Sequence, residues 1–133
     1  MGDGDRAAGG LAMDDSLRLE DWAGQTIRVV CDRPLGATHP EHGYRYEVNY
    51  GFVPGVMAPD GEELDVYLLG TDEPLEVCDR AEVVAIVRRR DDIEDKLVAV
   101  VGGETWDAPK IAAAVQFQEQ FFDSYVEIAA DDA

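Results

Sequence analysis

The sequence predicts a mainly β domain: a small β-barrel or curled sheet of about five strands, with one C-terminal α-helix packed against it. Two observations support this prediction. Between residues 26 and 101, short segments rich in β-branched and apolar residues alternate with turns and polar loops. Beyond residue 107, apolar residues recur at the spacing of a helix instead.

The first two strands flank a long connection. Residues 26–31 (TIRVVC) are rich in β-branched side chains and predict a strand. Residues 32–59 are rich in Pro, Gly, His, Tyr and Asn, which indicates a long connection, and residues 48–53 within it predict a short strand.

The next strand, residues 64–69, follows a turn at Pro59-Asp60-Gly61. Side chains alternate between the two faces of a strand. One face is therefore expected to carry Asp65, Tyr67 and Leu69, and the other Leu64, Val66 and Leu68.

The C-terminal part predicts a hairpin and then a helix. Residues 82–87 and 97–101 are two further strands, joined by a long charged tip. Asp107 is the expected N-cap of the helix, with Pro109 in its first turn. Its apolar stripe, expected to pack in the core, comprises Ile111, Ala114, Val115, Phe117, Gln118, Phe121, Phe122 and Tyr125.

The 133 residues, 46% of them hydrophobic, suffice for one domain, which we place at residues 16–133. Residues 1–15 are expected to form a flexible acidic tail without the features of a signal peptide. No apolar run approaches the roughly 20 residues of a membrane helix. Cys31 and Cys78 have neither metal-site nor disulfide spacing, so we expect buried thiols and a cytoplasmic location.

The net charge of −18 restricts the possible partners. Nucleic-acid binding depends on neutralising phosphates with Lys and Arg, so no nucleic acid is expected as a partner. We interpret the acidity as a solvated, salt-adapted surface. An anionic substrate would need to arrive with metal or meet a locally inverted field.

The segment DGEELDV concentrates carboxylates at the start of an apolar strand, with Asp60, Glu62, Glu63 and Asp65 within six residues. A carboxylate that enters an apolar strand is costly to desolvate unless a cation compensates. Mg²⁺ prefers oxygen ligands and would do so. The alternative is an exposed turn with solvated acids.

A second acidic run precedes Lys96, which would bind phosphate as a point charge. Its acids would complete a metal site, or they would pair with the arginines at 88–90 in a solvated hairpin tip. These acids are Asp91, Asp92, Glu94 and Asp95.

Phosphate donors occur earlier in the chain. Arg33 follows a predicted strand, and Tyr46 and Tyr50 lie in an aromatic-rich segment; guanidinium and phenol groups donate well to phosphate oxygens. His39 and His42 would suit a metal, but we interpret them as surface residues of a loop.

The order of these pieces resembles the family I soluble inorganic pyrophosphatases. The motifs are a DR after a strand, Y-x-x-NYGF-x-P, DG-x-x-LDV, K-x-x-AV after an acidic stretch, and FF-x-x-Y, between residues 26 and 125. The resemblance implies a five-stranded OB-like barrel that hydrolyses pyrophosphate to two phosphates through a Mg-activated water. Mn²⁺ is a second candidate cofactor, and a homo-oligomer is compatible with the resemblance.

The resemblance also implies roles for individual residues. The catalytic pair would be Glu62 and Asp65, with Asp65 also bridging two metal ions. The other metal ligands would be Asp60 and Glu94, with Asp91 as a candidate for an acid position at which an ungapped alignment places Arg89. The substrate-binding residues would be Arg33, Tyr46, Tyr50, Lys96 and Tyr125.

Several positions depart from the family pattern. Val126 stands where a phosphate-binding lysine is usual, Glu62 and Glu94 replace aspartates, and the family's N-terminal lysine and glutamates have no match. These departures leave a second reading open: a non-catalytic pyrophosphatase-like barrel that binds metal, phosphate or a protein partner. A third reading is an unrelated acidic OB-like binding domain for an oligosaccharide or a peptide.

Overall fold

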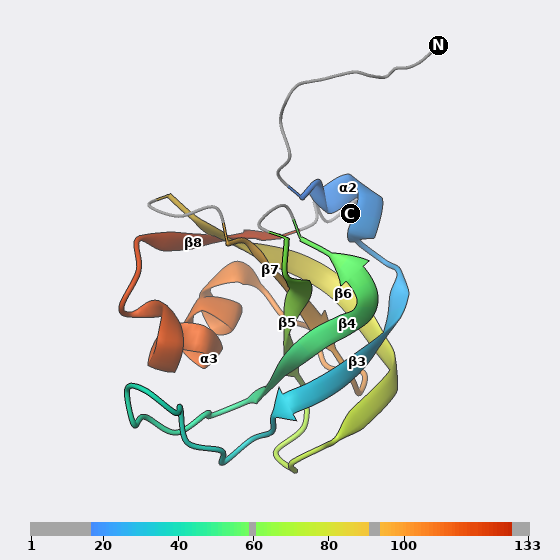
Figure 1. Cartoon of the computed structure of the whole chain (residues 1–133). Coiled ribbons are helices and arrows are strands. Elements are labelled where there is room, and N and C mark those ends of the chain that lie inside the picture. Colours follow the sequence, from blue (N-terminus) through green and yellow to red (C-terminus); the bar gives the residue numbers. More distant parts are fainter. Residues whose placement is uncertain (1–16, 59–60, 91–93, 129–133) are drawn as a thin grey trace.

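The computed structural model describes residues 17–58, 61–90 and 94–128, and the strands in these ranges follow the apolar segments of the sequence (Figure 1). Two helices and six strands occur in this part of the chain, and most strands are longer than predicted. They are α2 (Leu19–Trp22), β3 (Thr26–Arg33), β4 (Asn49–Met57), β5 (Glu63–Leu69), β6 (Val77–Arg89), β7 (Lys96–Val100), α3 (Ala108–Glu119) and β8 (Ser124–Ile128).

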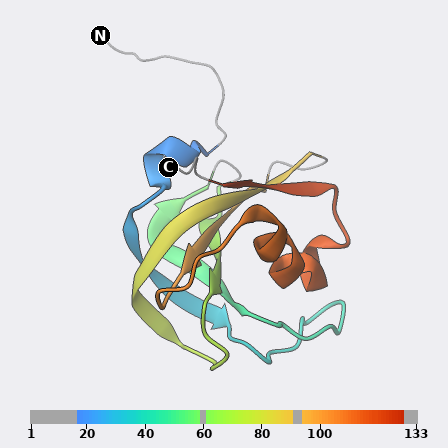
Figure 2. The same ribbon diagram turned by 180° about the vertical axis from the view of Figure 1, so that it is seen from behind.

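Five of the strands close into a barrel in the order β3-β4-β5-β7-β6, because β6 pairs back onto β3. Strands β5 and β7 are parallel, and the other pairs are antiparallel. Figures 1 and 2 show α3 beside the barrel on the side away from β3. The predicted barrel with a covering C-terminal helix is confirmed.

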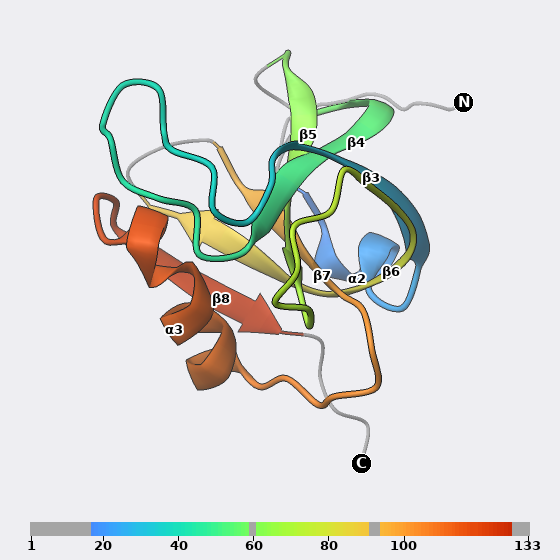
Figure 3. The same ribbon diagram turned by 90° about the horizontal axis from the view of Figure 1, so that it is seen from below.

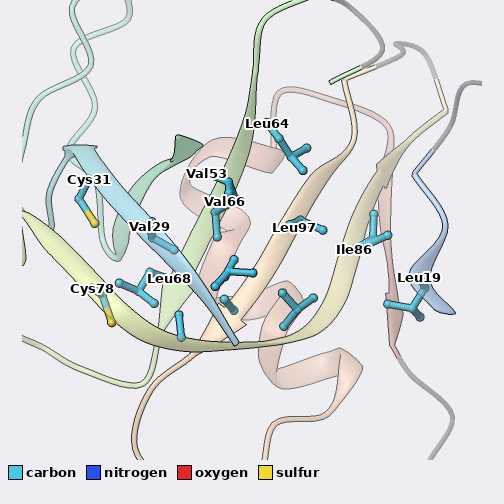
Figure 4. Close-up of a cluster of buried hydrophobic side chains, with 14 residues drawn as sticks. Leu19, Val29, Cys31, Val53, Leu64, Val66, Leu68, Cys78, Ile86 and Leu97 are labelled. Atoms are coloured by element: carbon cyan, nitrogen blue, oxygen red, sulfur yellow. The ribbon is translucent and has the colours of Figure 1, made fainter. Parts of the chain in front are cut away.

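The alternation predicted for residues 64–69 separates two cores. Leu64, Val66 and Leu68 point into the barrel, where they pack with Val29 and Leu97 (Figure 4). The opposite face packs under α3, in a second cluster that includes Tyr67, Leu69, Ile111, Val115 and Phe117. Asp65 shares this second face, so the carboxylate lies outside the barrel core, on the side that faces the helix.

The helix begins as predicted but ends early. The Asp107 side chain accepts a hydrogen bond from the Lys110 backbone N–H, and a proline lies in the first turn. The prediction from helical spacing that the helix continues to Tyr125 was wrong, because the helix ends at Glu119. Residues Ser124–Ile128 instead form β8, which pairs with residues 85–89 of β6.

The free edge of β6 explains this difference. Strand pairing satisfies the backbone groups of a segment with two β-branched residues, Val126 and Ile128, whose β-propensity outweighs the helical spacing. Phe121 and Phe122 lie in the turn between α3 and β8 and are 59% and 36% exposed. The prediction that the whole aromatic stripe packs in the core was therefore wrong beyond Phe117.

Gly51 allows the closest approach between β3 and β4. A Cβ at this position would lie 1.9 Å from the backbone oxygen of Val30, a distance that no side chain tolerates. Beyond a register shift that follows Val30, the same two strands place Arg33 opposite Tyr50 in the ladder. The NYGF segment thus aligns two of the predicted phosphate donors.

The two cysteines are free thiols buried in the barrel core, as predicted (Figure 4). Burial raises the pKa of Cys31 to about 11, so its thiol stays protonated. No helix within residues 17–58, 61–90 and 94–128 has the length and apolar character to cross a membrane. The predicted tail, residues 1–15, lies outside the described residues.

Candidate active site

A cavity of about 300 Å³ lies between the barrel and the C-terminal end of α3. The connection between β3 and β4 borders it, and Figure 3 shows this loop beside the end of the helix. Five strands, α3 and the segments between elements contribute to its lining. The lining residues are Asp32, Arg33, His39, His42, Tyr44, Tyr46, Tyr50, Asp65, Arg89, Glu94, Lys96, Gln118, Phe121 and Phe122.

Lys96 joins the two predicted acidic segments. Parallel pairing of β5 with β7 places the start of β7 beside Asp65. The Lys96 ammonium donates to Asp65 Oδ2 at 2.8 Å and lies 3.8 Å from Glu94 Oε1. The Lys96 side chain is 3% exposed, whereas the carboxylates of Asp65 and Glu94 are 37% and 40% exposed. A carboxylate of β5 and one from the segment before β7 therefore converge on one buried cation.

Arg33 and Tyr50 line the cavity from β3 and β4, the strands that precede β5 in the sheet order. The Tyr50 ring centroid lies 5.5 Å from Lys96 Nζ. Burial, and then the negative charge of Asp65, raise the pKa of Tyr50 well above its ordinary value, so the phenol remains a hydrogen-bond donor. Burial also raises the pKa of the neighbouring Asp32 carboxyl.

Arg89 lines the cavity, although the sequence analysis did not predict it as a site residue. Its guanidinium donates to both carboxylate oxygens of Glu119, at 3.1 and 2.8 Å, and to Glu94 Oε1 at 3.3 Å. The ring of Phe122 lies 3.5 Å from its central carbon. Burial alone would lower the pKa of Arg89, but the hydrogen bonds and charge of Glu119 outweigh burial and raise it. The guanidinium is a fixed positive charge.

A chain of hydrogen bonds anchors Glu119 from behind. The Tyr67 hydroxyl donates to Glu119 Oε2 at 2.6 Å, and Gln118 Nε2 donates to the Tyr67 oxygen at 2.7 Å. The hydroxyls of Tyr44 and Tyr46 both donate to Gln118 Oε1. This network connects the β3–β4 loop, the end of α3 and Arg89, so it holds the cavity wall rigid.

The described acids of the second acidic run pair with arginines, as one of the two readings expects, and the metal-site reading stays a prediction. Arg88 pairs with Asp95 at 2.9 Å, as expected for a hairpin tip whose charges are internally paired. Glu94 and Lys96 instead face the cavity. Successive side chains of a strand point to opposite faces, so neighbouring charges in this segment have different surroundings.

The two histidines lie at the cavity wall, with ring centroids 4.8 Å apart. His39 Nδ1 accepts hydrogen bonds from the backbone N–H groups of Glu41 and His42, so this nitrogen is engaged in shaping the loop. Burial lowers the pKa of His39. His42 is exposed, in agreement with the surface reading.

Two predicted site residues that the structure describes, Glu62 and Tyr125, are not among those that line the cavity. Glu62 is exposed and precedes β5. Tyr125 lies on β8 with its ring 4.4 Å from the guanidinium carbon of Arg90. Asp60 and Asp91 lie outside the described residues. The roles that the resemblance implies for these four stay predictions.

The described carboxylates fit a divalent ion that enters together with phosphate. Mg²⁺ is usually bound through one or two carboxylates plus the phosphates of its substrate, and Asp65 and Glu94 converge on a single cation position. Within residues 17–58, 61–90 and 94–128, no three His, Cys, Asp or Glu side chains are arranged to hold a metal ion.

The fold and the site together define a β-barrel with an ionic cavity under its covering helix. The family model of the inorganic pyrophosphatases matches residues 23–131, and the chain belongs to this family. Two inorganic pyrophosphatases of Neisseria meningitidis are similar to it. The serogroup A protein is 45% identical over 104 residues, which cover 63% of this chain and 58% of the relative. The serogroup B protein is 45% identical over 100 residues, which cover 60% of this chain and 56% of the relative. The chain thus spans little more than half the length of these relatives.

Solved structures agree on the fold. An inorganic pyrophosphatase from Ehrlichia chaffeensis superimposes with a TM-score of 0.61 at 16% identity, over 80% of this chain and 90% of that chain. An inorganic pyrophosphatase from Neisseria gonorrhoeae superimposes with a TM-score of 0.53 at 20% identity, over 80% of this chain and 82% of that chain. At these identities the likeness supports the fold alone.

Proposed function

We propose that this chain hydrolyses inorganic pyrophosphate to two phosphates in the cavity beneath α3. The observation that carries the proposal is the convergence in one cavity of Asp65 from β5, Lys96 from β7 and Glu94 from the segment before β7. Arg33 and Tyr50 line the same cavity. Family membership and the names of the relatives support the same reaction.

The charge of the cavity supports an anionic substrate. Among its described lining residues, the three cations Arg33, Arg89 and Lys96 balance three carboxylates, Asp32, Asp65 and Glu94. The chain as a whole carries −18. The cavity therefore brings together three cationic side chains that can contact a phosphate group, within a strongly acidic chain.

In the proposed reaction, Arg33, Tyr50 and Lys96 donate to phosphate oxygens and orient the substrate. Asp65 accepts a proton from a water molecule whose oxygen attacks one phosphorus in line. The bridging P–O bond breaks, and the second phosphate leaves with the bond's electron pair. Fixed donors around the developing charge are usually the largest catalytic contribution.

We propose Mg²⁺ as the cofactor, with Mn²⁺ as a substitute, held by Asp65 and Glu94 and, from the resemblance, Asp60 and Asp91. When bound, such an ion polarises a phosphoryl oxygen and lowers the pKa of water. We propose Glu62 as a second candidate for orienting the water and Tyr125 as a further phosphate ligand, on the resemblance alone. A cytoplasmic location is supported by the two free thiols.

A second candidate function is phosphate binding without catalysis. The pairing of Glu94 with Arg89 favours it, because a carboxylate already engaged by a protein cation is a weaker metal ligand.

Phosphate release from pyrophosphate, measured with excess Mg²⁺ and with EDTA, at low salt and in molar KCl, tests the proposal. We expect release that depends on Mg²⁺. Saturable binding of pyrophosphate without any release would contradict hydrolysis and support the second candidate. Neither binding nor release under any condition would contradict both.

A further inference from the structure

We propose that Arg89 is a built-in cation of the phosphate site, so that the site binds a pyrophosphate group before it binds a divalent ion. The inference rests on the proposed function only in that the cavity accepts pyrophosphate. It adds an order of binding and a role for Arg89, which in an ungapped alignment stands at a position where the resemblance expects an acid.

The first step is the rigidity of the guanidinium. The side chains of Arg89 and Glu119 are each 3% exposed, and two hydrogen bonds join them. Phe122 covers the guanidinium, and Tyr67 holds Glu119. A charge fixed in this way needs no reorganisation when an anion enters the cavity.

The second step is the state of the two carboxylates that would bind metal. Asp65 is paired with Lys96 at 2.8 Å, and Glu94 lies 3.3 Å from Arg89 and 3.8 Å from Lys96. Both cations are almost fully buried, where screening by solvent is weak. A divalent ion that binds either carboxylate of the empty site must therefore compete with the cation already paired to it.

The third step is the effect of a phosphate group. Its oxygens would take hydrogen bonds from Lys96 and Arg89 and add negative charge, which frees oxygens of Asp65 and Glu94. A divalent ion would then find carboxylate and phosphate ligands together. Because coupling between two ligands is reciprocal, the metal must strengthen phosphate binding by the same factor.

Two titrations test this order on the full chain. Methylenediphosphonate, a pyrophosphate analogue that cannot be hydrolysed, is titrated calorimetrically in EDTA. Mn²⁺ is titrated alone, with the free ion followed by electron paramagnetic resonance. For the natural chain we expect saturable binding of the analogue without metal, and binding of Mn²⁺ alone that is weaker than millimolar.

The variant Arg89→Gln is expected to shift the two affinities in opposite directions. Loss of a charged donor should weaken binding of the analogue by about tenfold or more, while Mn²⁺ alone should bind about tenfold more tightly. A general folding defect would weaken both. Arg28→Gln removes the same charge from an exposed site on β3 and should change neither affinity by more than about twofold.

Micromolar binding of Mn²⁺ to the natural chain alone would overturn the inference, as would analogue binding that requires metal. Loss of both affinities in a folded Arg89→Gln chain would do the same. If that variant does not fold, the two titrations of the natural chain still decide. Phosphate release is measured separately, so a chain that binds the analogue without metal but hydrolyses nothing contradicts only the proposed hydrolysis.

Discussion

Replacing Asp65 with asparagine is expected to lower kcat/KM for pyrophosphate by about 100-fold to 10,000-fold, the range that general acid–base catalysis contributes. The asparagine keeps the shape of the side chain but cannot accept the proton of the attacking water. It also removes the charge that faces Lys96 at 2.8 Å. Initial rates of phosphate release with saturating Mg²⁺ measure the effect.

Two further variants serve as controls for the rate of Asp65→Asn. Asp79→Asn makes the same chemical change at an exposed position distant from the cavity and should leave the rate unchanged. Glu62→Gln tests the second candidate base, which is exposed and does not line the cavity, so we expect a smaller loss than for Asp65→Asn. A full rate for Asp65→Asn with a large loss for Glu62→Gln would assign the proton transfer to Glu62 instead.

Glu119→Gln is expected to lower the free energy of unfolding by about 3–5 kcal/mol, the usual cost of removing one partner of a buried ion pair. The glutamine has nearly the same volume but leaves the guanidinium of Arg89 without its bidentate carboxylate. Urea unfolding measures the change. Asp123→Asn, which removes a carboxylate from an exposed pair with Arg90, should cost no more than about 1 kcal/mol.

The same pair predicts a dependence of stability on pH. Burial would raise the pKa of Glu119, but hydrogen bonds from Arg89 and Tyr67 outweigh burial and lower it below 4.5. A depressed pKa in the folded state adds stability above the unfolded value, and this stability is lost as the pH falls through the folded value. The natural chain should therefore lose more stability than Glu119→Gln below about pH 5. Parallel curves for the two chains would contradict the ion pair's importance.

Local patterns predicted most of the barrel and its inner face. Alternation along residues 64–69 fixed which side chains enter the barrel, and Asp107 marked the start of the helix. The end of α3 could not be predicted, because apolar residues at helical spacing continue into a segment that pairs with β6. That pairing depends on a free strand edge, which is a property of the assembled sheet.

The predicted donors and acids were easier to find than the network behind them. Arg33, Tyr50, Asp65 and Lys96 lie in motifs and meet in one cavity. Arg89 was hidden in a run of three arginines whose members face different surroundings.

Two signals could have indicated this network. Strand alternation places Arg89 on the same face as the buried Val87. Gln118, a polar residue in the apolar stripe of the helix, pointed to a buried hydrogen-bond partner.

The most direct test of the central claim is a map of where a pyrophosphate analogue binds. Nuclear magnetic resonance of the isotope-labelled chain, titrated with methylenediphosphonate and Mg²⁺, reports the residues whose signals shift. We expect the largest shifts at Arg33, Tyr50, Arg89 and Lys96, with the signals of Arg28 unchanged. Saturable binding that leaves these four residues unaffected would show that the cavity beneath α3 is not the substrate site.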